Sequence, residues 1–221
     1  MSVITKLNMT SDTLTPSELE DQKLAAQVFA GLLGQIIEFT DLTGPGIEEI
    51  HISNAGSHVG AAGYHIWRNQ TPIGYISPRN SGNRLWGHYI APLDVHAVTI
   101  NGVTTPAHRV HEALYTPGIC TVIAHELAEM WADRDIATFT HPDSKGRQWL
   151  LEPCDWVYGT YFIRSIGHNV AIFPNVAFNF DLTFKTNKWD LLGILKGPFT
   201  RTPKGYAYGR INGGQLFPIT D

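Results

Sequence analysis

The segment VIAHELAEMWAD, residues 122–133, combines the apolar spacing of a buried helix with one histidine and three carboxylates. At about 100° per residue, its charged positions fall within one sector of a helix that overlaps the apolar side: His125, Glu126, Glu129 and Asp133. Carboxylates one turn apart repel each other, and partly buried ones need a cation nearby. The segment therefore predicts an inward-facing helix that holds a metal ion.

A second interpretation leaves these carboxylates at a solvated helix end, where Arg134 or Arg147 would neutralise them. The sequence further along the chain bears on this choice. Residues 150–155, LLEPCD, place Glu152 and Asp155 among apolar neighbours. Because a buried carboxylate requires a partner, this second acidic segment favours the metal site.

Cys154 lies between these two later carboxylates. A thiolate is a good soft metal ligand, but the short offset from Glu152 makes it awkward for both to bind one ion. We therefore expect Cys154 to pack as a small buried hydrophobe.

The two segments together resemble the gluzincin-type zinc metallopeptidases, in which an H-E-x-x-H helix is followed by an E-x-x-D or E-x-x-x-D element. The resemblance implies that His125 and Glu152 bind zinc, and that Glu126 is the general base for a metal-bound water. It also implies that Asp155 orients a ligand without touching the ion, and Asp155 itself is the alternative ligand. Position 129 is a glutamate where the family has its second histidine, so Glu129 takes the place of that ligand.

A closer resemblance is to a zincin-like family of uncharacterised phage and bacterial proteins, marked by an H-E-V-x-E-M helix, a following aspartate and then E-V-C-D. The matching residues are 125–130, Asp133 and 152–155, and Gly63-Tyr64-His65 is similar as well. This resemblance implies a zincin-like fold with a helix-borne metal site in a phage virion or prophage context. Asp133 and His65 are then alternative ligands or residues that orient ligands, and His65 would supply the nitrogen that position 129 lacks.

The acidic ligand set shapes the expected chemistry. Glu129 and Glu152 together cancel the charge of a divalent ion, so bound water should be less acidic and hydrolysis slow. Zinc is the expected ion because an imidazole favours transition metals, with Mn, Mg or Ca as alternatives that prefer oxygen.

Two functions are consistent with this site. The first is a zincin-like metal-binding protein that is a weak or degenerate metallopeptidase acting on peptides. The second is a phage virion structural or assembly protein in which the site is structural or inactive. Glu126 beside His125 favours the first, because a purely structural site has no use for a base. The low charge, the many aromatic residues and the Gly/Pro-rich C-terminal part favour the second.

Three segments are expected along the chain. Residues 1–14 are polar and without periodicity, which predicts a flexible arm. Residues 15–46 predict an amphipathic N-terminal helix that runs to about Phe39 and either packs on its own domain or mediates oligomerisation. Residues 47–221 predict the zincin-like metal-binding domain, rich in strand and turn signals. The expected fold class is α+β, with a mixed or antiparallel sheet, an active-site helix and the added N-terminal helix.

The composition narrows the classes of partner. The 221 residues carry a net charge of -4, which offers no basic surface to a nucleic acid. No apolar run is long enough for a membrane span and no signal peptide is evident, so we expect a soluble protein made in a cytoplasm and possible incorporation in a phage virion. A charged content of only 16% favours protein partners or a homo-oligomer. Cys120 and Cys154 are expected to be free thiols.

Overall fold

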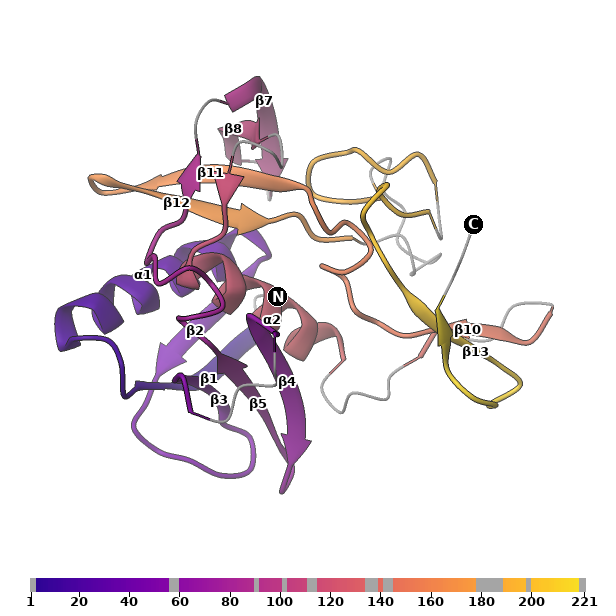
Figure 1. The fold of residues 1–221 in the computed structure, drawn as a ribbon, viewed down its shortest axis with the longest axis horizontal. Coiled ribbons are helices and arrows are strands. Elements are labelled where there is room, and N and C mark those ends of the chain that lie inside the picture. Colours follow the sequence, from indigo (N-terminus) through magenta and orange to yellow (C-terminus); the bar gives the residue numbers. More distant parts are fainter. Residues whose placement is uncertain are drawn as a thin grey trace.

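Two helices and a mixed sheet form the centre of the molecule (Figure 1). The computed structural model describes residues 3–55, 60–89, 92–100, 103–110, 115–133, 139–140, 145–177, 189–197 and 200–218. The helices in these residues are α1 (Pro16–Leu32) and α2 (Ile119–Ala132). The arrangement confirms the α+β class and the mixed sheet that the sequence predicts. Among the described residues, no helix has the length and apolar character to cross a lipid bilayer.

The largest sheet has five strands in the order β2-β1-β3-β5-β4. Its strands are β1 (Val3–Ser11), β2 (Gln35–Phe39), β3 (Glu48–Ile52), β4 (Gly63–Arg68) and β5 (Thr71–Ile76). All neighbours are parallel except β4 and β5, which form an antiparallel hairpin. Asn69 and Gln70 make its turn with left-handed φ angles of 51° and 63°, as a tight hairpin turn requires.

The N-terminal segment is a central strand, so the prediction of a flexible arm is wrong. β1 pairs with β2 on one side and with β3 on the other. Leu7 and Met9 are buried while Lys6 is exposed, which is the alternation of a strand with one covered face. The alternation escapes notice in the sequence because the polar residues Thr5 and Asn8 also occupy buried positions.

Helix α1 begins where the sequence predicts. The Thr15 hydroxyl accepts a hydrogen bond from the Glu18 N–H at 3.3 Å, and the Glu18 carboxylate accepts one from the Thr15 N–H at 2.8 Å. This reciprocal pair is a capping box, and Pro16 follows at the first helical position.

The same helix ends earlier than predicted, at Leu32 instead of near Phe39. Gly34 has a left-handed φ of 73°, a conformation that ends helices and that glycine adopts without strain. Residues 35–39 then form β2 beside β1, so that α1 is the crossover of a parallel β-α-β unit. The domain boundary predicted at residue 47 therefore falls inside one sheet.

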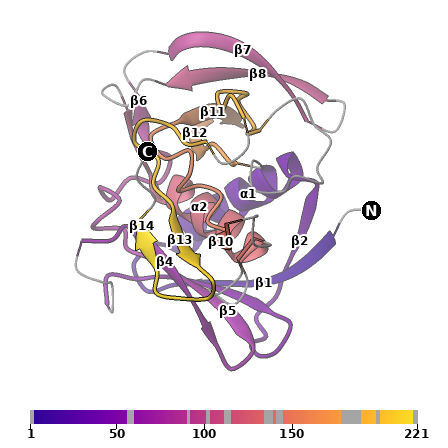
Figure 2. The same cartoon turned by 90° about the vertical axis from the view of Figure 1, so that its right-hand side faces the viewer.

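Helix α2 lies between two sheets, as Figures 1 and 2 show from two sides. One core cluster joins both helices to the five-stranded sheet and includes Leu7, Ile50 and Leu127. A second cluster joins the opposite sides of the helices, through residues such as Phe29, to Phe173 of a β-hairpin. That hairpin consists of β11 (Tyr161–Ile166) and β12 (Asn169–Pro174). The N-terminal helix is thus a packing helix of this domain.

The remaining described strands form or extend smaller sheets, in the orders β12-β11-β8-β7, β10-β13-β14 and β6-β9. They are β6 (His88–Tyr89), β7 (Pro92–Ile100), β8 (Val103–Val110), β9 (Tyr115–Thr116), β10 (Arg147–Trp149), β13 (Tyr208–Ile211) and β14 (Phe217–Pro218). Residues 151–160 form a run of turns between β10 and β11. This turn segment, called loop 151–160 below, carries the second set of candidate site residues.

Candidate metal centre

The acidic residues of α2 face the interior. The side chains of Glu126 and Glu129 are 4% and 5% exposed, and Asp133 at the end of the helix is fully buried. This burial contradicts the interpretation of a solvated acidic helix end. Of the two arginines proposed to neutralise it, Arg134 lies outside the described residues, and Arg147 on β10 holds its guanidinium over the Trp149 ring.

His125 has two carboxylate oxygens close to one of its ring nitrogens. Its Nε2 lies 3.0 Å from Oε1 of Glu129 and 3.3 Å from Oδ1 of Asp155. Both oxygens are buried, and neither has a hydrogen-bond partner with acceptable geometry. Ligand atoms in a tetrahedron around zinc, each about 2.1 Å from the ion, lie about 3.4 Å apart. Each oxygen therefore lies about as far from Nε2 as two ligands of one ion lie from each other, and neither contact has hydrogen-bond geometry.

The position of Asp155 favours the alternative role of ligand over that of orienting His125. A carboxylate that only orients a histidine ligand contacts the ring nitrogen turned away from the metal. Asp155 instead approaches Nε2, the nitrogen that also faces Glu129. Its oxygen thus lies on the side of the ring where an ion would bind.

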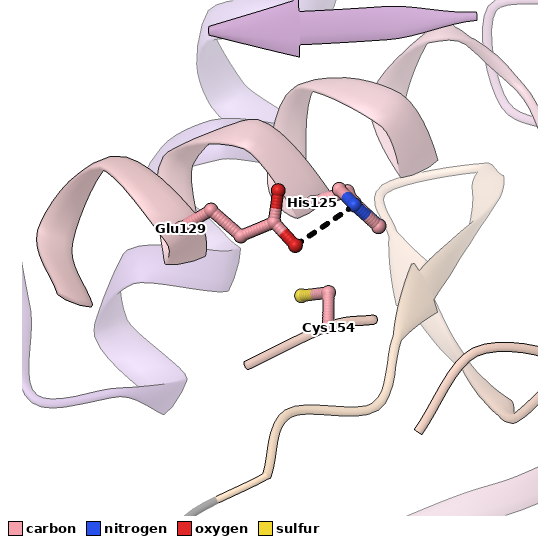
Figure 3. Close-up of side chains that lie close together, drawn as sticks. All are labelled: His125, Glu129 and Cys154. Carbon is pink, nitrogen blue, oxygen red and sulfur yellow. Dashed lines mark ion pairs between the residues drawn. The ribbon is translucent and has the colours of Figure 1, made fainter. Parts of the chain in front are cut away.

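Candidate ligand atoms within 4.8 Å of one another form three groups: His125, Glu129 and Cys154; His65, Glu126 and Glu129; and Glu129, Glu152 and Asp155 (Figure 3 for the first). Glu129 belongs to all three groups, so it is the centre of the cluster. Glu152, predicted as the third ligand, has a carboxylate oxygen within 4.8 Å of carboxylate oxygens of Glu129 and Asp155. The structure thus brings the predicted site residues into one region, although Glu152 is grouped with carboxylates only and Asp133 belongs to none of the three groups.

Strand β4 brings His65 against α2. Its Nδ1 lies 3.2 Å from Oε2 of Glu126, within hydrogen-bond distance, and 3.9 Å from Oε2 of Glu129. Its other ring nitrogen, Nε2, is buried without a hydrogen-bond partner. The close approach depends on Gly63, because a Cβ there would lie 2.5 Å from Oε1 of Glu126.

Burial makes the two central carboxyl groups weak acids. It raises the pKa of Glu129 to about 8, with His125 opposing the rise and Asp155 adding to it. Burial, followed by the charge of Glu129, raises the pKa of Glu152 to about 10. A bound divalent cation would reverse both shifts, because positive charge favours ionised carboxylates.

The pKa values of the two imidazoles are raised, which favours their positively charged forms beside the carboxylates. Burial alone lowers the pKa of His65, but the hydrogen bond with Glu126 and the charge of Glu152 outweigh it and raise the pKa. For His125 burial also acts downward, and the charge of Glu129 leads the effects that raise its pKa well above the ordinary value. The negative potential of the cluster therefore attracts positive charge, as protons or as a metal ion.

Two side chains at the site were not among the predicted ligands. Cys154 packs in a core cluster, as expected, and its Sγ also lies within 4.8 Å of ligand atoms of His125 and Glu129. Tyr206 reaches the site from the C-terminal part of the chain, where its N–H donates to the Asp155 carbonyl at 2.9 Å. Burial and the charge of Asp155 raise the pKa of Tyr206. The E-x-C-D spacing is the one sequence signal that could have found Cys154, and no local pattern points to Tyr206.

No protein-family model, no curated protein and no solved structure matched this chain. The chemistry of the site is therefore inferred from its own residues.

Proposed function

We propose that this chain is a zincin-like protein that binds one divalent metal ion, zinc in the first place, and hydrolyses peptide bonds slowly. The observation that carries the proposal is the approach of two buried carboxylate oxygens, from Glu129 and Asp155, to Nε2 of His125 without hydrogen-bond geometry. An imidazole nitrogen with carboxylate oxygens is a donor set that zinc accepts, whereas Mg and Ca prefer oxygen alone.

The zincin-like part of the proposal is supported by where the ligands come from. The first ligand and the base stand next to each other on α2, and the later ligands follow on loop 151–160. The hairpin strands β4 and β5 pack against the same helix at the edge of the sheet. This is the order of elements that the resemblance implies.

Glu126 is the residue proposed as the general base. When bound, the ion would supply Lewis acidity that makes water more acidic and polarises a carbonyl group. Glu126 neighbours the ligand His125 in sequence, and its carboxylate is held by His65 at 3.2 Å. A fixed, buried carboxylate in this place can accept a proton and later return it to a leaving amine.

Strand β4 supports a peptide as the substrate class. It is the last strand in the order of the five-stranded sheet, so one of its edges is unpaired within that sheet. An extended peptide can add to such an edge through main-chain hydrogen bonds. The same strand carries His65, so a peptide bound there would lie next to the base.

The first experiment compares the wild-type protein with Glu126→Gln and with Glu49→Gln as a matched control. Glu49 also contacts a histidine, His51, at 3.0 Å, but on β3 and away from the cluster. We expect about one equivalent of metal in all three proteins, by elemental analysis without chelators. We expect peptide cleavage in the wild type and in Glu49→Gln, and none in Glu126→Gln.

The possible outcomes test the base, the metal site and the peptidase activity separately. Cleavage retained by Glu126→Gln would rule out this base, and a wild-type protein free of metal would remove the site. Metal that stabilises the fold while no peptide is cleaved would support the structural alternative, in which the ion only holds the fold together.

A further inference from the structure

Cys154 is held in a fixed place by the turns of its loop. The Asp155 N–H donates to the Glu152 carbonyl at 3.2 Å, and the Ala177 N–H donates to the Pro153 carbonyl at 3.0 Å. The cysteine between these bonds is only 2% exposed. The position of its sulfur is therefore determined by the fold.

The sulfur faces the metal centre. Sγ of Cys154, a ring nitrogen of His125 and a carboxylate oxygen of Glu129 all lie within 4.8 Å of one another. Figure 3 shows the three side chains extending toward one another, from α2 on one side and from the loop on the other. Oε1 of Glu129 is buried and has no hydrogen-bond partner, so its lone pairs are available to bind a metal ion.

Cys120 shows what a packing cysteine looks like in the same protein. It is equally buried, and its Sγ lies 3.8 Å from the carbonyl oxygen of Ile172, a distance typical of a weak S–H hydrogen bond. Cys154 belongs to the same core cluster, but its sulfur also lies beside an imidazole and a carboxylate, side chains that commonly bind metals. Both cysteines are free thiols.

We propose that Cys154 binds the metal ion as a thiolate, together with His125 and Glu129. The inference rests on the proposed metal site and specifies a ligand for it. On binding, the thiol gives its proton to solvent and the sulfur donates an electron pair to the ion. A soft sulfur ligand selects zinc or cobalt over Mg and Ca, which sets the metal preference of the site.

Cobalt(II) is the probe that tests this ligand, because a thiolate bound to cobalt gives an intense charge-transfer band in the near ultraviolet. Metal-free protein is titrated with Co²⁺, and the band is followed beside the weaker visible bands that report binding itself. We expect the near-ultraviolet band in the wild type and in Cys120→Ser, the matched control. We expect Cys154→Ser to lack the band and to bind Zn²⁺ at least about tenfold more weakly.

The result that overturns the inference is cobalt bound with visible bands but without the near-ultraviolet band, or a band that survives in Cys154→Ser. In either case the metal site itself would stand. Wild-type protein that binds no cobalt would overturn both proposals. Should Cys154→Ser fail to fold, X-ray absorption of the zinc-loaded wild type decides instead, since a sulfur neighbour at about 2.3 Å is either present or absent.

Discussion

Gly63 determines how closely β4 approaches Glu126, the proposed base. A Cβ at this position would lie 2.5 Å from both Oε1 of Glu126 and Cγ1 of Val122, so Gly63→Ala forces a buried shift. We expect a loss of about 1–3 kcal/mol in the free energy of unfolding, measured by chemical denaturation. Gly31→Ala on α1 is the control, because its Cβ meets nothing within 4 Å and should stabilise by up to about 1 kcal/mol. Equal losses in both variants would contradict this account.

The burial of the site residues on α2 can be predicted from the sequence, whereas the positions of those on loop 151–160 cannot. A helix has a fixed rotation per residue, so the spacing of Glu126 and Glu129 was enough to predict that both are buried. Loop 151–160 has no such period. Which ring nitrogen of His125 meets Asp155, and where Cys154 points, depends on turns that only the folded chain determines.

At the scale of elements, the start of α1 depends on one hydroxyl group. Thr15→Ala removes the acceptor for the Glu18 N–H, and we expect it to cost about 1 kcal/mol of stability. Thermal unfolding measures the loss. The control is Ser17→Ala in the same turn, at an exposed position where the change should stay within about 0.5 kcal/mol. A Thr15→Ala protein as stable as the control would show that the cap contributes nothing.

The two ends of that helix show why one boundary was predicted and the other was not. The start has a local signature in Thr15, Pro16 and Glu18, so the sequence is sufficient. The end competes with strand formation, because Ile36 and Ile37 fit the helical spacing and also fit a strand. Pairing with β1 makes residues 35–39 a strand. The spacing of residues within one segment does not reveal pairing with a distant segment.

At the scale of the molecule, the buried cluster links stability to pH. Glu129, Glu152, His65 and His125 all have pKa values above their ordinary ones in the fold. A group of this kind contributes its full stabilisation below its unfolded pKa and loses it as the pH rises through the folded pKa. For Glu129 that window runs from 4.5 to about 8.

We therefore expect metal-free protein to lose thermal stability as the pH rises through this window. Bound zinc neutralises the carboxylates, so the gain in melting temperature on adding zinc should be larger at about pH 8 than at about pH 5. Scanning calorimetry with chelator and with zinc checks both expectations. A zinc-induced gain that is the same at both pH values would contradict the linkage.

The enclosure of α2 between two sheets fixes the helical part of the proposed metal centre. Helix residues that pack on both sides cannot shift without disturbing two cores, so His125 and Glu129 stay where the packing holds them. Loop 151–160 is also held, because the Asp155 N–H donates to the Glu152 carbonyl and the Ala177 N–H donates to the Pro153 carbonyl. With ligands fixed from both sides, the spacing set by the fold would decide which ionic radius fits.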